Sequence, residues 1–152
     1  MSGTNPLSGN VYLDTNIFIE AFEEKDEISR LLERLFRSAS ASSRLHLFTS
    51  QLTLAEALAK PYEEKRTDLV SLYEAALTDN SALTIIPIDA SVLRGLASAR
   101  SVRKMKLPDA IQATAAAYCR TFLTDDTGFR SDALLLVARP TASILTNLIG
   151  RA

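Results

Sequence analysis

The strongest constraint on the fold of this chain is the alternation of short apolar runs with longer segments of helical periodicity. In the segment 26–40, for example, apolar side chains recur at the i, i+3, i+4, i+7 and i+8 spacing of one helix face. Strands that alternate with helices favour right-handed crossovers and a mainly parallel sheet. We therefore predict a three-layer α/β/α protein around a mainly parallel central sheet of about five strands.

The boundaries of the predicted elements follow from the same patterns. Runs rich in Val, Ile, Leu and Phe predict strands at residues 11–14, 45–49, 83–88, 121–124 and 134–137. Helices are predicted at residues 16–24, 26–40, 51–59, 62–77, 91–103, 109–118 and 141–149. Ser50 can cap the helix that follows it, Pro61 is expected to interrupt that helix, and Pro108 suits a first helical position.

The whole chain, residues 1–152, is expected to form one domain, because a chain of this length buries roughly two-thirds of its unfolded surface around a single core. Residues 1–9 are polar and are predicted to form a flexible arm, without the basic and apolar regions of a signal peptide. No apolar stretch reaches the roughly 18 residues that a membrane-spanning helix needs. Cys119 is the only cysteine, which excludes an intramolecular disulfide. We expect a cytoplasmic protein that does not contact a membrane.

Acidic residues recur where the predicted strands end. Asp14 closes the first strand, Asp125 and Asp126 follow the fourth, and Glu56 lies two turns into the helix after the second strand. Asp109 opens the helix that leads into the fourth strand. Because ligands of open α/β sheets bind beyond the carboxyl ends of the strands, we expect these acids to converge at one sheet edge.

Such an acidic cluster needs a counter-ion. Two carboxylates about 4 Å apart repel by roughly 4 kcal/mol at an effective dielectric constant near 20. Oxygen ligands without His or Cys favour Mg²⁺ or Mn²⁺ over zinc. A divalent cation held in this way can neutralise phosphoryl oxygens and activate water, so the pattern points to phosphodiester hydrolysis.

Each acid also has a simpler interpretation when it is taken alone. Asp109 can interact with a helix dipole, Glu56 can be a solvated helix position, and Asp125 and Asp126 can form a turn before Gly128. Asp14 is harder to explain in this way, since a strand-ending acid after Val-Tyr-Leu would be desolvated. The combination of the acids favours the functional interpretation.

Four sequence segments resemble the PIN domains, and especially the VapC-type toxins of type II toxin–antitoxin pairs. VYLDTNIFIE resembles the opening strand of the family with its Asp-Thr-Asn, and TSQLTLAEALAKP resembles its Ser-led helix with an acidic residue. LPDAIQATAAA resembles the third acidic motif, and FLTDDTGF resembles the strand that ends in Thr-x-Asp. The resemblance covers roughly residues 10 to 138 and implies a PIN-like fold.

The resemblance implies a divalent-metal-dependent endoribonuclease whose acidic quartet is Asp14, Glu56, Asp109 and Asp126. These four residues would be the catalytic and metal-binding acids, with Mg²⁺ or Mn²⁺ as cofactor. It also implies that Asn16 and Thr124 orient the acids, although either can simply cap a helix or turn. Asp125 stands where the family often has Asn, so it either adds a fifth charge or braces the turn. The approach to the third acid, SVRKMKLPD, lacks the Gly that is common in the family.

A basic segment precedes the third acid. Residues 90–108 contain no acidic side chain, whereas the chain as a whole has a net charge of −1. We predict that this segment guides an RNA backbone to the metal, because phosphate contacts fix position without carrying sequence information. A solvated helix face is the alternative. The residues expected to contact RNA are Arg100, Arg103, Lys104 and Lys106, with Arg94 in the same segment.

The toxin resemblance implies protein partners as well as an RNA substrate. An antitoxin is expected to wrap the chain and to place a basic side chain near the acids, and a homodimer is also expected. Apolar residues of the first two helices can contribute to these contacts or to the core. These residues are Ile17, Phe18, Phe22, Leu31 and Leu35.

Three other functions fit parts of the sequence. A haloacid-dehalogenase-like phosphatase would use Asp14 as nucleophile, but it wants a second acid two residues later, where this chain has Asn16. A catalytically silent PIN-like module would bind RNA or protein without turnover, which the complete set of acids argues against. A PIN nuclease that processes structured RNA remains an alternative to a toxin. His46 and Cys119, the only residues of their kinds, are expected to be structural.

Overall fold

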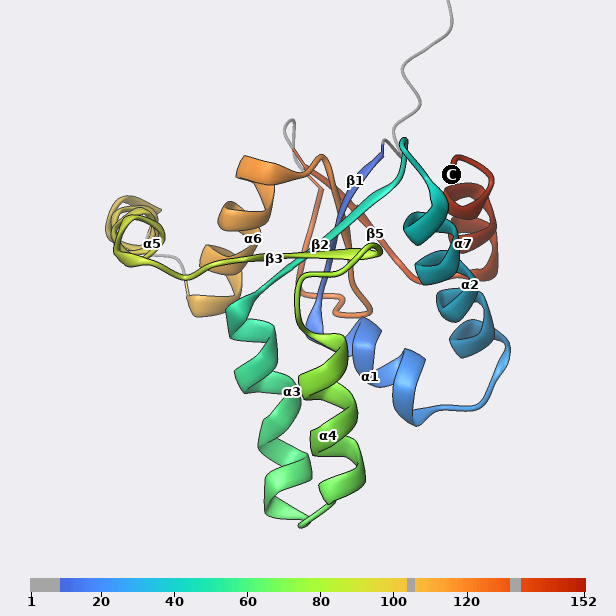
Figure 1. Cartoon of the computed structure of the whole chain (residues 1–152). Coiled ribbons are helices and arrows are strands. Elements are labelled where there is room, and N and C mark those ends of the chain that lie inside the picture. Colours follow the sequence, from blue (N-terminus) through green and yellow to red (C-terminus); the bar gives the residue numbers. More distant parts are fainter. Residues whose placement is uncertain (1–8, 104–105, 132–134) are drawn as a thin grey trace, which may run out of the picture.

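The computed structural model describes residues 9–103, 106–131 and 135–152, except for the side chains of some residues in the helices that cover residues 90–118. The sheet lies at the centre of the molecule and helices lie on both of its faces (Figure 1). Its strands are β1 (Asn10–Leu13), β2 (His46–Ser50), β3 (Leu83–Ile86), β4 (Thr121–Leu123) and β5 (Leu136–Ala138).

The five strands are all parallel and follow the order β3-β2-β1-β4-β5. Helices connect β1 to β2, β2 to β3 and β3 to β4, so the α/β/α architecture predicted from the alternating pattern is confirmed. The helices are α1 (Thr15–Glu23), α2 (Glu27–Ala41), α3 (Gln51–Glu63), α4 (Thr67–Ala76), α5 (Ala90–Arg103), α6 (Leu107–Tyr118) and α7 (Ala142–Ile149).

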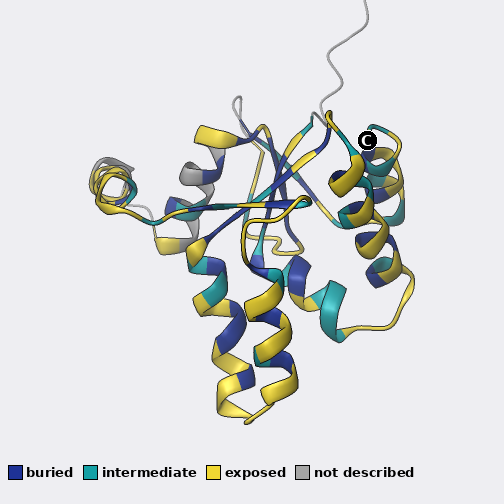
Figure 2. Ribbon diagram, viewed as in Figure 1, coloured by how far each residue is buried: buried dark blue, intermediate teal, exposed yellow. Residues whose placement is uncertain are grey.

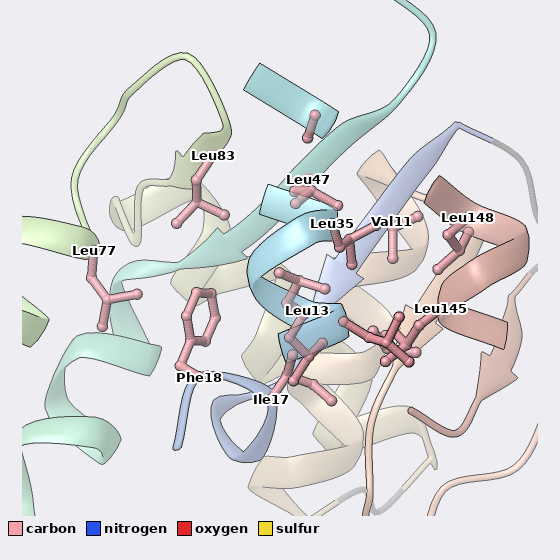
Figure 3. Close-up of a cluster of buried hydrophobic side chains, with 14 of the residues drawn as sticks. Val11, Leu13, Ile17, Phe18, Leu35, Leu47, Leu77, Leu83, Leu145 and Leu148 are labelled. Atoms are coloured by element: carbon pink, nitrogen blue, oxygen red, sulfur yellow. The ribbon is translucent and has the colours of Figure 1, made fainter. Parts of the chain in front are cut away.

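Two apolar cores lie on opposite faces of the sheet. Successive side chains of a strand point to opposite faces, so Val11 and Leu13 of β1 enter the first core and Tyr12 enters the second. The first core is formed with α1, α2, α3, α4 and α7, and Figure 3 shows Phe18 and Leu35 among its side chains. In the second core, Tyr12 stacks on Phe122 with ring centroids 5.3 Å apart, beneath α6. The buried residues in Figure 2 therefore concentrate along the strands and the inner helix faces.

Most of the residues proposed as possible partner contacts belong to the first core. Ile17, Phe18, Leu31 and Leu35 are buried, so they stabilise the fold and are not available to another chain. Phe22 is only partly buried and lines a hollow of about 430 Å³ between α1, α2 and α4.

Two helix boundaries differ from the predicted ones. Pro61 does not interrupt α3 but lies buried in its last turn, where the helix continues to Glu63. The chain reverses instead at Lys65, which has a φ of 55°. This reversal is not marked by Gly, the residue that most often adopts such a conformation. α4 therefore begins at Thr67 rather than at residue 62, and the α3–α4 hairpin projects from the body of the molecule (Figure 1).

The predicted cap of α3 is correct in position but not in its hydrogen bond. Ser50 is the residue that precedes the helix, yet its side chain makes no capping bond. Its Oγ instead accepts a hydrogen bond of 3.0 Å from the buried Tyr12 hydroxyl. Capping by side chains occurs at α2 and α7, where Asp26 and Thr141 accept from Ser29 N and Ile144 N.

The start of the described chain is fixed to the sheet. The Gly9 carbonyl accepts a hydrogen bond of 2.6 Å from His46 N, so Gly9 is not part of a flexible arm. A Cβ atom at this position would lie 1.9 Å from the Arg44 carbonyl oxygen, which only glycine avoids. The remainder of the predicted arm, residues 1–8, lies outside the described residues. Within the described part of the chain, no helix combines the length and apolarity needed to cross a membrane.

Candidate active site

The candidate site lies where β1 and β4 end side by side. Asp14 follows β1 directly and caps α1, and the segment from Thr124 to Asp126 follows β4. The Asp14 N–H donates a hydrogen bond of 3.0 Å to the Leu123 carbonyl, which ties the two strand ends together. β1 has β2 on one side and β4 on the other, so the strand order reverses at β1. Ligands of open α/β sheets bind at such a reversal, beyond the carboxyl ends of the strands.

The Asp14 carboxylate is held by three hydrogen bonds. Its Oδ1 accepts from Thr15 N at 2.8 Å. Its Oδ2 accepts from the Thr124 hydroxyl at 2.7 Å and from Asn16 Nδ2 at 3.3 Å. Because the donors come from β4 as well as from α1, the carboxylate has a fixed position between the two strand ends.

Thr124 links Asp14 to the loop that carries Asp126. The buried Thr124 Oγ1 accepts hydrogen bonds from Asp126 N at 3.0 Å and from Asn16 Nδ2 at 3.2 Å while it donates to Asp14. Asp126 Oδ1 in turn accepts from Gly128 N at 2.8 Å. A Cβ atom at Gly128 would lie 3.1 Å from Asp126 Oδ1, so the small residue allows this tight turn. The predicted orienting positions, Asn16 and Thr124, therefore both contact the site.

Three of the four predicted acids line one cleft of about 610 Å³. These are Asp14 after β1, Glu56 on α3 and Asp126 after β4. Apolar side chains complete the walls, among them the exposed Leu107 and the half-buried Phe129. The predicted convergence of acids from distant positions is thus present for these three residues.

Two of the acids have pKa values above the ordinary range. Burial raises the pKa of Asp14, and the negative charge of Asp126 adds to this, while hydrogen bonds from Thr124 and Thr15 lower it in part. Burial, followed by the charge of Asp14, raises the pKa of Glu56. The Thr15 hydroxyl lies near Glu56 and opposes this shift, although it does not meet the geometry of a hydrogen bond. Ionisation of these two carboxyl groups is thus less favourable in the cleft than it is in water.

The other two acids predicted at the site are Asp109 and Asp125. Asp109 lies in the first turn of α6, as predicted, but its side chain lies outside the described part of the structure. Asp125 is exposed and pairs with Arg139, Nη2 to Oδ1 at 2.8 Å, and its N–H donates to Asn16 Oδ1 at 3.0 Å. Asp125 is therefore positioned to brace the turn and is not among the residues that line the cleft.

The oxygen donors of the cleft suit a hard cation. Thr15 Oγ1 is buried, lines the cleft, and has no hydrogen-bond partner among the described residues. The described residues that line the cleft include neither His nor Cys. No three acidic, His or Cys side chains among those described form a ready-made ion site. This is compatible with Mg²⁺, which commonly binds through one or two carboxylates and keeps several waters.

The basic segment lies partly beside this cleft. Lys106 is exposed and directly precedes Leu107, which lines the cleft. Arg94 and Arg100 are exposed on α5, which packs against α6. Of the other residues predicted to bind RNA, the side chain of Arg103 and all of Lys104 lie outside the described part of the chain.

The two residues expected to be structural are remote from this chemistry. Burial raises the pKa of the Cys119 thiol to about 12, so the thiol is uncharged. His46 is exposed at the start of β2, where a ring nitrogen contacts the Ser43 carbonyl at 3.2 Å. Arg139, in contrast, was not found by sequence reasoning, because its partner Asp125 is distant along the chain and only the fold brings the two together.

The structure also resembles solved proteins of known type. One is from a toxin–antitoxin complex of Klebsiella pneumoniae, with 25% sequence identity and a TM-score of 0.58, covering 86% of this chain and 98% of the other. Another is from VapBC2 of Rickettsia felis bound to a DNA fragment of its promoter, with 19% identity, a TM-score of 0.58 and the same coverage. No curated protein matches the chain.

A family model confirms the resemblance seen in the sequence motifs. The model of the PIN domain matches residues 11–133, which is more than half of the chain and includes all four predicted acids. Together with the likeness to toxin–antitoxin structures, this confirms a PIN fold of the VapC type. The chain therefore belongs to the PIN domain family, a family of nucleases.

Proposed function

We propose that this chain is an endoribonuclease that depends on Mg²⁺ or Mn²⁺ and acts as the toxin of a toxin–antitoxin pair. The observation that carries the proposal is the placement of Asp14, Glu56 and Asp126 in one cleft at the carboxyl edge of the sheet. The raised pKa values of Asp14 and Glu56 support it, because a divalent cation would relieve both the desolvation and the repulsion of the carboxylates.

The acids of the cleft are proposed to hold the cation, with Asp109 as the fourth member of the set. When bound, the cation would supply charge stabilisation for the phosphoryl oxygens and lower the pKa of an attacking water. Thr124 and Asn16 orient Asp14 through their hydrogen bonds, and Thr124 also fixes the backbone of Asp126. Residues that orient metal ligands in this way commonly change activity by about 10–100-fold when they are lost.

RNA is the proposed substrate, with Arg100, Arg103, Lys104 and Lys106 as proposed backbone contacts. The exposed position of Lys106 next to the cleft-lining Leu107 supports this role for one of them. The overall charge of −1 requires such local attraction, since the chain as a whole does not attract a polyanion.

An antitoxin is the proposed partner, and a homodimer in the cytoplasm is the proposed state. The antitoxin is supported by the likeness to proteins solved as a toxin–antitoxin complex and as VapBC2 on promoter DNA.

The proposal is tested by incubating the purified protein with total RNA in MgCl₂, in MnCl₂ and in EDTA. We expect cleavage in at least one of the two metals and none in EDTA. Asp14→Asn should reduce the rate by about 10²–10³-fold or more, because it removes a charge needed where the cation binds. Asp68→Asn is the matched control, because Asp68 is exposed on α4, pairs with Arg66 and does not line the cleft. This variant should cleave RNA like the wild type. Cleavage that persists in EDTA or in Asp14→Asn would reject the proposal.

A further inference from the structure

Arg139 lies at the carboxyl edge of the sheet, beside the segment that carries Asp126. It directly follows β5, and the carbonyl of the preceding Ala138 accepts a hydrogen bond of 3.0 Å from Thr124 N. Its Nη2 donates to Asp125 Oδ1 at 2.8 Å. The pairing of Thr124 with Ala138 therefore places Arg139 beside Asp125, the residue that precedes the cleft-lining Asp126 in the sequence.

Several acidic side chains lie on the side of the molecule that carries Arg139. Asp14 and Asp126 line the cleft, and Asp125 lies at its edge. Burial raises the pKa of Glu20 on α1, and the interaction of its side chain with Asp26 and the charges of Asp26, Glu24 and Asp125 add to this shift. Negative charge therefore extends along this side. A polyanion that enters the cleft therefore meets repulsion here, and a guanidinium at this position offsets it.

The Arg139 guanidinium has further N–H groups beyond the one that binds Asp125. Arginine offers five N–H donors, and the bond to Asp125 uses one of them. The side chains of Arg139 and Asp125 are 46% and 64% exposed, so the pair is weakly stabilising and easily reached by a ligand. Planar, bidentate recognition of phosphate is the contact for which arginine is best suited.

We propose that Arg139 is a substrate-binding residue that contacts a backbone phosphate of the RNA strand next to the cleaved bond. This inference rests on the proposed nuclease function and assigns a residue that lies far along the chain from the basic segment 90–108. The phosphate would replace Asp125 as the partner of the guanidinium.

The test is the salt dependence of RNA binding. Binding of a fluorescein-labelled single-stranded oligouridylate is measured by anisotropy in CaCl₂ over a series of KCl concentrations, with a gel to verify that the RNA stays intact. Arg139→Gln should weaken binding by about five- to tenfold at low salt and reduce the slope of log K against log salt by about 0.7. Arg139→Lys should keep most of the slope, because it keeps the charge.

Two variants separate a phosphate contact from a structural brace. Asp125→Asn breaks the same ion pair but leaves Arg139 in place, so binding should not weaken. Arg66→Gln removes an arginine from a closely matched pair, 2.8 Å from Asp68 with side chains 50% and 65% exposed, near the tip of the α3–α4 hairpin. It should leave the slope unchanged.

Three results would overturn the inference: an unchanged slope in Arg139→Gln, an equal loss of affinity in Asp125→Asn, or no binding by the wild type. The nuclease proposal is judged separately by cleavage. If the wild type cuts RNA while Arg139→Gln binds and cuts equally well, the role of Arg139 is rejected and the nuclease function stands. If the wild type cuts no RNA, the nuclease function itself is rejected.

Discussion

Leu13 and Asp14 are neighbours in the sequence, but they lie in parts of the molecule with opposite physical demands. Leu13 is fully buried in the first core, where removal of apolar surface from water stabilises the fold. Asp14 lies in the cleft, where burial and the charge of Asp126 raise its pKa. The interior thus supplies stability, whereas the carboxyl edge contains groups that oppose it.

This difference assigns stability and chemistry to separate residues. A substitution in the core should change the free energy of unfolding but not the activity of each folded molecule. A substitution at the carboxyl edge should change the activity more than the stability, and removal of a carboxylate should even stabilise the metal-free protein. Each half of this statement can be tested by itself.

The largest loss of stability is expected in the core. Leu32 is fully buried on α2, and Leu32→Ala should lower the free energy of unfolding by about 2–5 kcal/mol because it leaves a cavity. Leu72→Ala, at a position that is 41% exposed, is the control and should cost much less. Urea unfolding measures both, and RNA cleavage at a temperature where Leu32→Ala is folded should match the wild type. If Leu32→Ala also cleaves less RNA per folded molecule, the claim that core residues affect stability but not activity is contradicted.

At the carboxyl edge, the largest effect short of losing an acid is expected at Thr124. Thr124→Val keeps the shape of the side chain but removes the donor to Asp14 and the acceptor for Asp126 N. We expect cleavage to fall by about 10–100-fold. Stability should fall by only about 0.5–1.5 kcal/mol, since Asp126 is exposed and water can replace the lost partner of its N–H.

Thr121→Val provides a matched control on β4, the strand that Thr124 follows. Thr121 is equally buried on β4, but its hydroxyl has no hydrogen-bond partner among the described residues. Its replacement should leave cleavage unchanged and leave stability equal or slightly higher. Equal loss of cleavage in the two valine variants would show that packing of β4, rather than the Thr124 hydrogen bonds, positions the acids.

The sequence predicted the sheet because apolar runs mark its strands, and it predicted that Asp14, Glu56 and Asp126 lie near one another because each comes soon after a strand ends. Asp14 and Asp126 follow β1 and β4, and Glu56 lies on the helix after β2. The α3–α4 turn was misplaced because Pro61 is tolerated in a last helical turn and Lys65 adopts a conformation usually marked by Gly. Arg139 was missed because its pairing with Asp125 depends on the register of β4 and β5, which no local pattern reveals.

The most direct test of the account is the melting temperature of metal-free wild type and Asp14→Asn in EDTA as a function of pH. Asn can keep the hydrogen bond from Thr15 N but replaces the other accepting oxygen with an NH₂ group, so the effect of the charge is measured by how the difference in melting temperature changes with pH. The folded-state pKa of Asp14 is raised above its ordinary value of 3.8, so its contribution to stability is present at lower pH and is lost as pH rises through the raised pKa.

Asp14→Asn should therefore melt above the wild type near pH 7, by about 2–4 °C if the relief is roughly 1 kcal/mol. The difference should shrink as pH falls through the raised pKa, because the carboxyl group of the folded wild type then becomes protonated. Asp68→Asn should not melt above the wild type, because Arg66 lowers the pKa of Asp68 to about 2 and its charge favours the fold. An Asp14→Asn variant that melts below the wild type near pH 7 would contradict the claim that the cleft holds carboxylates in need of a cation.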